Sequence, residues 1–297
     1  MKAGKKLGGF TILANLGTGA ASRLYAVQDP KTKQVWALKH VVKHNPKEQR
    51  FLDQTEREAE AGTRLSHPNV RKVFRLIRVK KLLKTVEMLL LMELVDGVSS
   101  EIHPPKTVDE MLSVWAQVAA GLTHMHECGW VHADMKPHNI IITEAGTAKI
   151  IDLGQSCRVG TIKERIQGTP DYIAPEQVHR REITEQTDVY NFGASLYWTL
   201  TGTHIPTALP KGDSLLSGAQ DDHLIERPQD PSELMPGTPP LLAALIMQCV
   251  EVELYKRPDS MAVVHDMLKE IREGLTPAQK QMSTQPKLPS HDERACG

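Results

Sequence analysis

The sequence lacks an excess of either charge, any apolar run long enough to cross a bilayer, and any internal repeat. Its 36 Lys and Arg residues balance 36 Asp and Glu residues, so composition gives no reason to expect nucleic acid or an anionic membrane as the main partner. The longest apolar stretches, residues 88–95 and 241–250, are too short to form a membrane span. Glycines interrupt the segment after the basic amino end, which argues against a signal peptide.

Cysteines are few and scattered. The four, at positions 128, 157, 249 and 296, form no pair with the spacing of a metal site. Reduced thiols and a cytoplasmic location are therefore expected. The chain nevertheless has 297 residues and 40% hydrophobic content, which is enough for one large lobe or two modest lobes with real cores.

The residues suited to chemistry concentrate between positions 129 and 154. Two short β-branched runs, at 139–142 and 148–151, flank a turn at Gly146 and predict a small hairpin. Around this hairpin lie two carboxylates, an amide and an ammonium: Asp134, Asp152, Asn139 and Lys136. Carboxylate and amide oxygens suit Mg²⁺, a lysine suits phosphate charge, and a carboxylate can act as the base for a hydroxyl. The pattern therefore indicates a site for a nucleotide phosphate and its metal.

At these residues the chain resembles the eukaryotic-type protein kinases, in particular their bacterial members. Residues 132–139, HADMKPHN, match the family's catalytic loop H-R-D-x-K-P-x-N, and residues 152–154, DLG, match D-F-G. Ala133 replaces the family's arginine, and Leu153 replaces its phenylalanine. The lysine–proline pair of the loop resembles serine/threonine kinases and implies an aliphatic hydroxyl as the acceptor.

The resemblance assigns a role to each residue of the loop. It implies that Asp134 orients the substrate hydroxyl and accepts its proton, and that Lys136 steadies the γ-phosphate. Asn139 and Asp152 would hold Mg²⁺. ATP and Mg²⁺ are the cofactors implied.

The amino-terminal part carries further motifs in the family's order. A glycine turn lies between strands expected at 10–16 and 23–28, and such a turn lets backbone N–H groups close over phosphates. Lys39 falls where the family's V-A-I-K lysine contacts the α- and β-phosphates. Residues 92–96 resemble the hinge between kinase lobes. By this resemblance, the nucleotide contacts fall on Gly17, Gly19, Leu24, Ala37, Lys39, Met92, the backbone of Glu93 and Val95, and Ile141.

A charged helix expected at about 48–65 offers three glutamates, Glu56, Glu58 and Glu60. Counting back from His-Pro-Asn at 67–69 places the family's lysine-pairing position on Glu58. The alternative interpretation is that all three glutamates form a solvated face. Gly62, one turn after Glu58, predicts a mobile helix, because a glycine inside a helix costs about 1 kcal/mol relative to alanine.

The carboxy-terminal part predicts a helix at 109–128 and others at 241–252 and 259–271. Residues 168–176, GTPDYIAPE, resemble the family's substrate-docking segment with its A-P-E close. The resemblance pairs Arg257 with Glu176 and makes Asp188 a brace of the catalytic loop. The alternative for Asp188 is a helix N-cap.

Ala133 also predicts how the activation segment is regulated. An arginine at this position pairs with an activation-segment phosphate in other members, so its absence predicts basal activity without prior phosphorylation. Thr161 and Thr169 remain candidates for modification. Residues 202–240 predict a loop with one short helix, and the residues after Gly274 predict a disordered tail.

Together these patterns predict an α+β, two-lobed protein kinase-like fold. A small antiparallel β-sheet lobe with one helix (10–96) would follow an extension (1–9) and precede a larger, mainly helical lobe (97–274) and a tail (275–297). The expected function is a protein serine/threonine kinase that uses ATP and acts on protein substrates, with the chain itself as one candidate. The alternatives are a small-molecule phosphotransferase of related fold and a pseudokinase-type binding scaffold.

Overall fold

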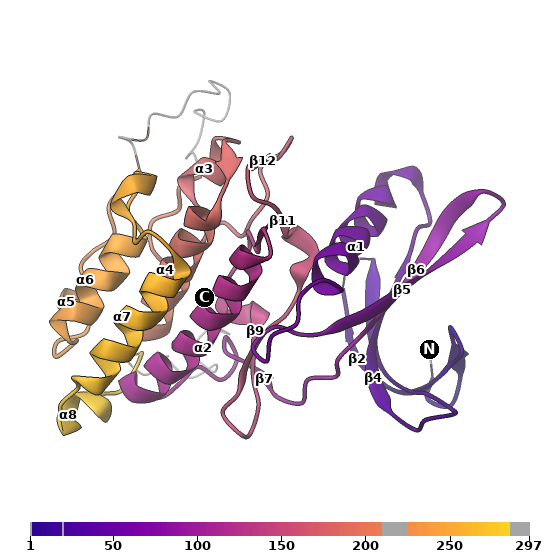
Figure 1. Ribbon diagram of the computed structural model, residues 1–297, viewed down its shortest axis with the longest axis horizontal. Helices are drawn as coiled ribbons and strands as arrows, with labels where there is room; N and C mark the ends of the chain where they lie inside the picture. The colour runs from indigo at the N-terminus through magenta and orange to yellow at the C-terminus, as the bar shows by residue number, and fades with distance from the viewer. Residues whose placement is uncertain (1, 20, 210–221, 223–224, 286–297) are drawn as a thin grey trace, which may run out of the picture.

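A β-rich lobe and a helical lobe make up the protein (Figure 1), as the sequence predicted. The structure is a computed structural model, and it describes residues 2–19, 21–209, 222 and 225–285. Across these ranges no helix is both long enough and apolar enough to traverse a membrane.

The small lobe is built on a six-stranded antiparallel sheet with strand order β1-β2-β3-β4-β6-β5. Its strands are β1 (Lys6–Leu7), β2 (Phe10–Thr18), β3 (Ser22–Gln28), β4 (Val35–Val42), β5 (Val73–Lys81) and β6 (Lys84–Met92). Alternating apolar residues such as Phe10, Ile12, Val27 and Leu38 turn one face of this sheet into a buried core. Leu7 joins that core, and β1 pairs with β2. Part of the predicted N-terminal extension (1–9) thus forms the first strand of the small-lobe sheet.

Helix α1 (Gln49–Gly62) follows a short 3₁₀ turn, η1 (Pro46–Glu48), and packs through Leu52 on Val41 and Met88 of the sheet. Gly62 is the last residue of α1, so the penalty for a helix-interior glycine does not apply. A Cβ at Gly62 would overlap the side chain of Val73 and lie 3.3 Å from Leu153 Cδ1. The glycine thus allows close packing between α1 and β5 and does not by itself indicate a mobile helix.

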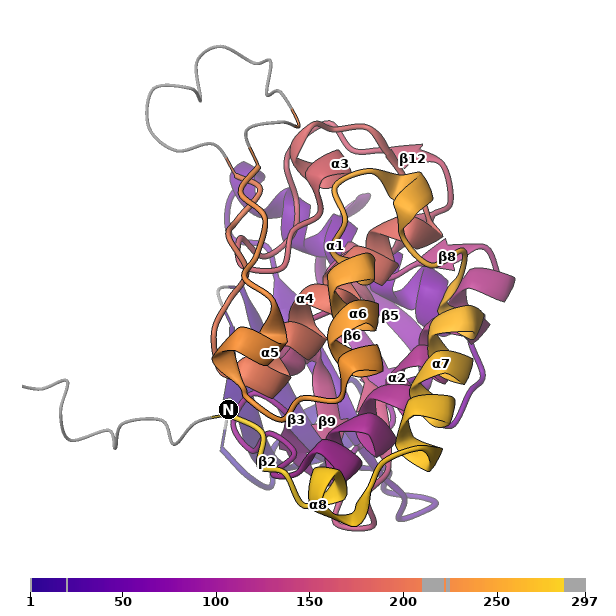
Figure 2. The same cartoon turned by 90° about the vertical axis from the view of Figure 1, so that its left-hand side faces the viewer.

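The large lobe is a helical bundle around a core that includes Trp115 and Phe192, whose rings meet edge to face at 4.9 Å. Figure 2 shows α6 and α7 in front of α2 and α4, with the strands of the small lobe behind. The principal helices are α2 (Val108–Glu127), α4 (Glu185–Thr201), α6 (Pro240–Cys249) and α7 (Met261–Glu273), and the short ones are α3 (Pro175–Val178), α5 (Pro231–Leu234) and α8 (Pro277–Lys280).

The predicted hairpin is confirmed and lies where the two lobes meet. β9 (Ile140–Ile142) pairs with β10 (Ala148–Ile150), and β7 (Val98–Ser99) completes the sheet. Two backbone hydrogen bonds, Ile150 N to Asn69 O at 2.8 Å and Arg71 N to Ile150 O at 2.9 Å, join the hairpin to the loop after α1. Two further ribbons, β8 (Trp130–Val131) with β11 (Cys157–Arg158) and β12 (Thr161–Ile162) with β13 (Glu182–Ile183), frame the activation segment.

The predicted disorder after Gly274 is wrong for residues 275–285. Helix α8 forms there, the Val108 N–H donates to Met282 O at 2.9 Å, and the Thr284 N–H donates to Lys106 O at 3.0 Å. Backbone hydrogen bonds to the start of α2 hold this segment, so its polar composition does not prevent it from folding. Residues 286–297 of the predicted tail, and 210–221 with 223–224 of the predicted loop, lie outside the described residues. The described remainder of that loop contains the short helix α5.

Candidate active site

A lysine–glutamate pair links the small-lobe sheet to its helix. Lys39 on β4 places Nζ 2.6 Å from Oε2 of Glu58 on α1 and 4.0 Å from Oδ1 of Asp152. Glu58 is 1% exposed, and Arg71 Nη2 lies 3.4 Å from its other carboxylate oxygen. Burial alone would lower the pKa of Lys39, but the carboxylates of Glu58 and Asp152 outweigh it and raise this pKa above the ordinary value. The ammonium therefore stays charged, as a phosphate ligand requires.

Asp152 begins the D-L-G stretch in the left-handed region, with φ 60° and ψ 72°. Its Oδ1 accepts a hydrogen bond from the Gly154 N–H at 3.3 Å, which fixes the carboxylate beside Lys39. Burial acts to raise the pKa of Asp152, but the charges of Lys39 and Arg71 outweigh it and leave the pKa below its ordinary value. The carboxylate is thus ionised and suited to a cation.

The fully buried carboxylate of Asp188 holds the backbone of the catalytic loop. Asp188 near the start of α4 accepts the backbone N–H groups of His132 and Ala133, both at 2.8 Å, and its Oδ2 lies 2.9 Å from His126 Nε2. Ala133 has φ 59°, so these bonds fix a backbone conformation that alanine rarely adopts. The brace predicted for Asp188 is therefore present, and the N-cap alternative is not, since the N-cap of α4 is Thr184.

The side chains of Asp134, Lys136 and Thr169 contact one another at the catalytic loop. Lys136 Nζ lies 3.2 Å from Asp134 Oδ2 and donates to Thr169 Oγ1 at 2.6 Å, while the Thr169 hydroxyl donates to Asp134 Oδ1 at 2.8 Å. An aliphatic hydroxyl thus sits between a carboxylate that accepts its proton and an ammonium that contacts its oxygen. Sequence reasoning treated Thr169 only as a candidate for modification. Its place in the G-T-P docking motif was the signal that could have linked it to the loop.

The residues expected to hold Mg²⁺ lie next to this group. Asn139 is 1% exposed, and its amide nitrogen donates to the Asp134 carbonyl at 2.9 Å, which leaves the amide oxygen as its metal-binding atom. The Ile151 N–H donates to Asn139 O at 2.8 Å, so the residue before Asp152 is tied to Asn139. One amide and one carboxylate oxygen fit Mg²⁺, which takes the rest of its ligands from water and substrate phosphates. In the described ranges no three His, Cys, Asp or Glu residues gather into an additional metal site.

Three of the residues expected to contact the nucleotide, Leu24, Ala37 and Met92, come together in the small lobe. Strand register places Leu24 opposite Lys39 and Ala37 opposite Met92, and Leu24, Ala37 and Met92 share one apolar cluster. Ile141 lies on β9 opposite Ser99. Leu24, Ala37 and Met92 thus provide an apolar surface on the small-lobe sheet.

At the hinge, the carboxylate and the N–H of Glu93 both have partners within the protein. The carboxylate of Glu93 pairs with Lys149 at 2.9 Å, and its N–H donates to Lys72 O at 2.8 Å. Within the described chain, the backbone groups of Val95 have no backbone partner. The Glu93 carbonyl and the Val95 amide are therefore the hinge groups that a purine base could bind.

The glycine turn joins β2 to β3. The Gly19 N–H donates to the Ser22 carbonyl at 2.8 Å, and Gly17 lies opposite Leu24 in the β2–β3 register. A Cβ at Gly17 would meet no atom within 4 Å, whereas one at Gly19 would lie 2.9 Å from Ser22 Oγ. Residue 20 lies outside the described chain.

The docking segment is anchored by the buried pair expected from the sequence. Arg257 Nη1 and Nη2 donate to the two oxygens of Glu176 at 2.9 and 3.0 Å. The same guanidinium donates to the carbonyls of Gln186, Glu251 and Val252 and lies over the ring of Tyr190. Both side chains are almost fully buried, so this is not a surface ion pair.

Comparison with known proteins identifies the family to which this two-lobed fold belongs. Residues 10–268 match the family model described as "Protein kinase domain". The chain belongs to the protein kinase family.

Its relatives include bacterial serine/threonine kinases. It is 27% identical to serine/threonine-protein kinase PknD of Chlamydia pneumoniae, covering 89% of this chain and 31% of that protein. It is 28% identical to serine/threonine-protein kinase PrkC of Bacillus subtilis, covering 68% of this chain and 32% of that protein. The chain thus spans about a third of the length of these two relatives. The PknI kinase domain of Mycobacterium tuberculosis has the same fold, with a TM-score of 0.69, 22% identity and coverage of 91% of this chain and 99% of that one.

Proposed function

We propose that this protein is a serine/threonine protein kinase that transfers the γ-phosphoryl group of ATP to hydroxyl groups of proteins. The observation that carries this proposal is the contact of Asp134 and Lys136 with the hydroxyl of Thr169. A substrate serine or threonine needs the same two contacts: a carboxylate to accept its proton and a cation beside the oxygen that attacks phosphorus.

The other residues have roles that follow from their geometry. Lys39, held charged by Glu58, would bind the α- and β-phosphates, and Lys136 would balance the charge on the γ-phosphate. Asn139 and Asp152 would hold Mg²⁺, which supplies charge neutralisation at the phosphates when bound. Asp188 would act as a positioning residue, because it holds the backbone of the loop that carries Asp134.

The two alternatives are distinguished by specific features. A small-molecule phosphotransferase would share Lys39 and the two carboxylates, but it has no need of the docking segment that Arg257 and Glu176 anchor. A binding scaffold would tolerate loss of a site residue, whereas here Lys39, Glu58 and Asp134 are all retained. We accordingly propose protein substrates, including the chain itself, and a cytoplasmic location that cell fractionation would test.

The test is phosphate transfer from labelled ATP with Mg²⁺ to the protein itself and to a generic basic protein, after phosphatase treatment. We expect label on serine or threonine, without prior phosphorylation of the segment, because Ala133 replaces the arginine that would pair with a segment phosphate. An Asp134→Asn variant is the matched control. No label despite ATP binding would reject the kinase and direct attention to the scaffold, and transfer only to metabolites would favour the small-molecule enzyme.

A further inference from the structure

The hairpin that joins β5 to β6 extends beyond the rest of the small-lobe sheet. Strand β4 contacts β6 no further than Val86, whose carbonyl accepts a hydrogen bond from the Lys43 N–H at 2.9 Å. Closer to the turn, β5 and β6 pair with each other, up to Lys81 opposite Lys84. Figure 1 shows this hairpin projecting from the small lobe on the side away from the helical lobe. We call residues 80–84 the hairpin tip.

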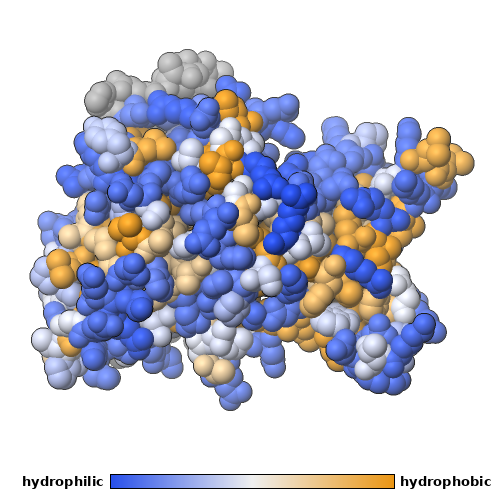
Figure 3. All heavy atoms as spheres, viewed as in Figure 1, coloured by the Kyte–Doolittle hydropathy of each residue, from blue (hydrophilic) through white to orange (hydrophobic). Residues whose placement is uncertain are grey.

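Two leucines form the turn at the end of the hairpin. Leu82 and Leu83 are each 94% exposed, more than any other large apolar side chain in the described part of the chain. Figure 3, in the same view as Figure 1, shows hydrophobic atoms gathered at the end of this hairpin with hydrophilic atoms beside them. A protruding apolar patch with a polar rim is typical of an interaction surface.

The leucines also oppose the backbone geometry of the turn. Leu82 has φ 55°, which lies in the left-handed region that favours glycine. Two-residue hairpin turns usually carry glycine or asparagine where φ is positive, so the fold alone would favour glycine at this position. A strained leucine that packs on nothing in the protein therefore indicates a contact outside the chain.

Lysines surround the two leucines. Lys80, Lys81 and Lys84 are all exposed, and within the described ranges none of the three has a carboxylate oxygen within 4.0 Å of its ammonium. Further from the turn, Arg78 does have such a partner, Glu56. Lys81 and Lys84 face each other across the two strands, and like charges directly opposite each other destabilise a hairpin. An anionic surface beside the tip would offset this repulsion.

The stretch that contains the tip has no acidic residue. Residues 71–86 include seven Lys and Arg residues and no Asp or Glu, although the whole chain carries 36 residues of each sign. The balanced composition gave no reason to expect an anionic membrane as the main partner. It nevertheless conceals a local excess of positive charge around the most exposed leucines of the described chain.

We propose that the hairpin tip docks the protein on an anionic lipid bilayer. Leu82 and Leu83 would enter the boundary between headgroups and acyl chains, and the three lysines would contact the lipid phosphates. The order of groups along the hairpin matches a bilayer, because the apolar side chains lie at the end and the ammonium groups one or two residues behind them. Lysine side chains keep their ammonium groups in the polar headgroup region while their methylene stems cover apolar surface.

The shape of the tip favours a bilayer over a protein partner. A protein would need a pocket that accepts two adjacent leucines from a projecting turn, with carboxylates placed around its rim. A bilayer that contains anionic lipids offers both an apolar layer and negative charge without a preformed pocket.

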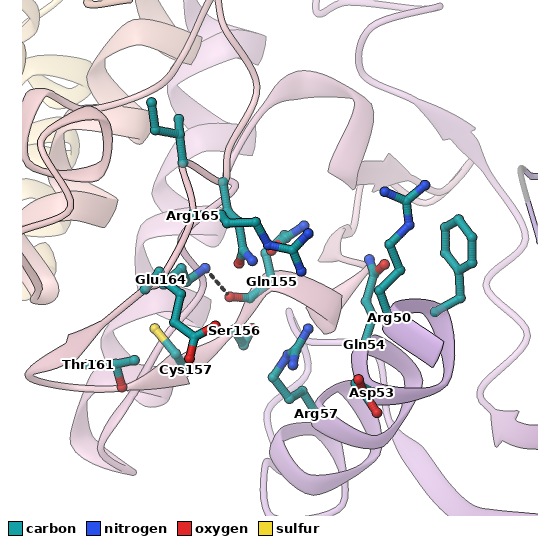
Figure 4. Close-up of a pocket in the computed structure, with 14 residues that line it drawn as sticks. Arg50, Asp53, Gln54, Arg57, Gln155, Ser156, Cys157, Thr161, Glu164 and Arg165 are labelled. Atoms are coloured by element: carbon teal, nitrogen blue, oxygen red, sulfur yellow. Dashed lines mark hydrogen bonds between the residues drawn. The ribbon is translucent and has the colours of Figure 1, made fainter. Parts of the chain in front are cut away.

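Docking through the tip would leave the catalytic cleft open. Strand β6 runs nine residues from Lys84 to Met92 at the hinge, which corresponds to about 30 Å. Figure 4 shows a cavity on the helix side of the small lobe, lined by residues of α1 and the activation segment such as Arg57 and Arg165. The tip takes no part in that cavity. Access to membrane-associated substrates rests on the proposed kinase function, whereas lipid binding does not.

Vesicle sedimentation without ATP tests the proposal on the whole chain. The protein is mixed with phosphatidylcholine vesicles in which about a third of the lipid is phosphatidylserine, or with vesicles of phosphatidylcholine alone. We expect sedimentation with the anionic vesicles, release as the NaCl concentration rises, and binding to the neutral vesicles at least about tenfold weaker. Hydrogen exchange in residues 79–86 should slow when the anionic vesicles are added.

Two variants separate the contributions of charge and apolar contact. The triple variant Lys80→Gln/Lys81→Gln/Lys84→Gln should weaken binding to anionic vesicles about 100-fold, at roughly fivefold for each lysine. Leu82→Gly/Leu83→Ser should weaken binding about tenfold or more. Its melting temperature should equal or exceed that of wild type, because glycine suits the φ of position 82. A merely structural role of the leucines would instead lower the melting temperature of this variant.

Matched controls make the same changes elsewhere on the surface. Lys2→Gln/Lys5→Gln/Lys6→Gln removes three exposed lysines at the β1 edge of the sheet, and Leu241→Ser removes a leucine that is 70% exposed on α6. Both controls should bind the anionic vesicles as wild type does. Equal losses in the two lysine triples would overturn the proposal, as would failure of the wild type to sediment with anionic vesicles. The latter result would leave a protein as the partner of the tip.

Discussion

Replacement of Arg257 by methionine should cause a large loss of stability. The change leaves Glu176, which is 1% exposed, as a buried carboxylate without its bidentate partner. It also removes the hydrogen bonds to three backbone carbonyls, at 2.8, 2.8 and 3.1 Å. Breaking a buried pair by removing one partner costs about 3–5 kcal/mol in free energy of unfolding.

This loss corresponds to a melting temperature lower by roughly 6–20 °C, at about 2–4 °C per kcal/mol for domains of this size. Urea denaturation followed by circular dichroism, together with a thermal scan, measures both quantities. The double variant Arg257→Met/Glu176→Leu should recover part of the loss, because no charge then remains buried.

Lys256→Met is the matched control. Lys256 precedes Arg257 and pairs with Glu253 at 2.9 Å, but both side chains are more than 40% exposed. An exposed pair of this kind contributes about 0–1 kcal/mol. If Arg257→Met lost no more stability than Lys256→Met, the inference that the docking segment depends on this buried pair would be refuted.

Three other predictions concern the small lobe and the catalytic loop. Lys39→Met should lower kcat/KM for ATP at least about 100-fold, because it removes a preorganised charge contact, and Glu58→Gln should lower kcat/KM less. Equal effects of the two variants in steady-state kinetics would argue against Lys39 as the phosphate ligand. Gly62→Ala should lower the free energy of unfolding by about 1–3 kcal/mol through overlap with Val73, and adding Val73→Ala should restore part of it; urea curves showing a stabilised Gly62→Ala would contradict this packing. Burial alone would raise the pKa of Asp188, but hydrogen bonds from His126 and the loop backbone hold this pKa below the ordinary 3.8. The contribution of Asp188 to the stability of the fold is therefore complete above pH 3.8, and it is lost as the pH falls through the lower pKa of the folded state. Denaturation between about pH 5 and pH 2 should therefore show a smaller pH dependence for Asp188→Asn than for wild type, and identical slopes would count against the brace.

The sequence predicted those parts of the fold whose signal is local. Helix α2 carries Trp115, Val118, Leu122 and Met125 on one face, so its period was readable and its bounds shifted by only one residue. The hairpin of β9 and β10 was equally readable, because β-branched runs flank a glycine turn.

Parts held by contacts distant in sequence could not be predicted in this way. The two residues of β1 pair with β2 only because Leu7 finds a place in the small-lobe core. Residues 282–285 are fixed by backbone bonds to 106–108 and Leu200, which their own composition does not encode. Gly62 was interpreted as an interior glycine because neither the helix end nor the approach of Val73 is visible in the sequence.

In the candidate site, too, local motifs were predictable from the sequence and contacts between distant residues were not. Motifs indicated Lys39, Glu58, Asp134 and Asp152, and the structure places carboxylate oxygens of Glu58 and Asp152 within 4.0 Å of the Lys39 ammonium. The contact of Thr169 with the catalytic loop crosses 35 positions and required the fold. The cavity lined by Arg57 of α1 and Arg165 of the activation segment likewise combines residues about 100 positions apart.

The most direct test of the central claim compares ATP binding with phosphoryl transfer in wild type and Asp134→Asn. Asp134 Oδ1 accepts a hydrogen bond from the Thr169 hydroxyl at 2.8 Å, and asparagine keeps the shape of the side chain while removing the proposed base. We predict that the variant binds Mg·ATP as tightly as wild type while single-turnover transfer to serine or threonine falls by about 10²–10⁴-fold. Transfer at the wild-type rate would contradict the assignment of Asp134 as the base, and absence of transfer by wild type itself would contradict the proposed kinase.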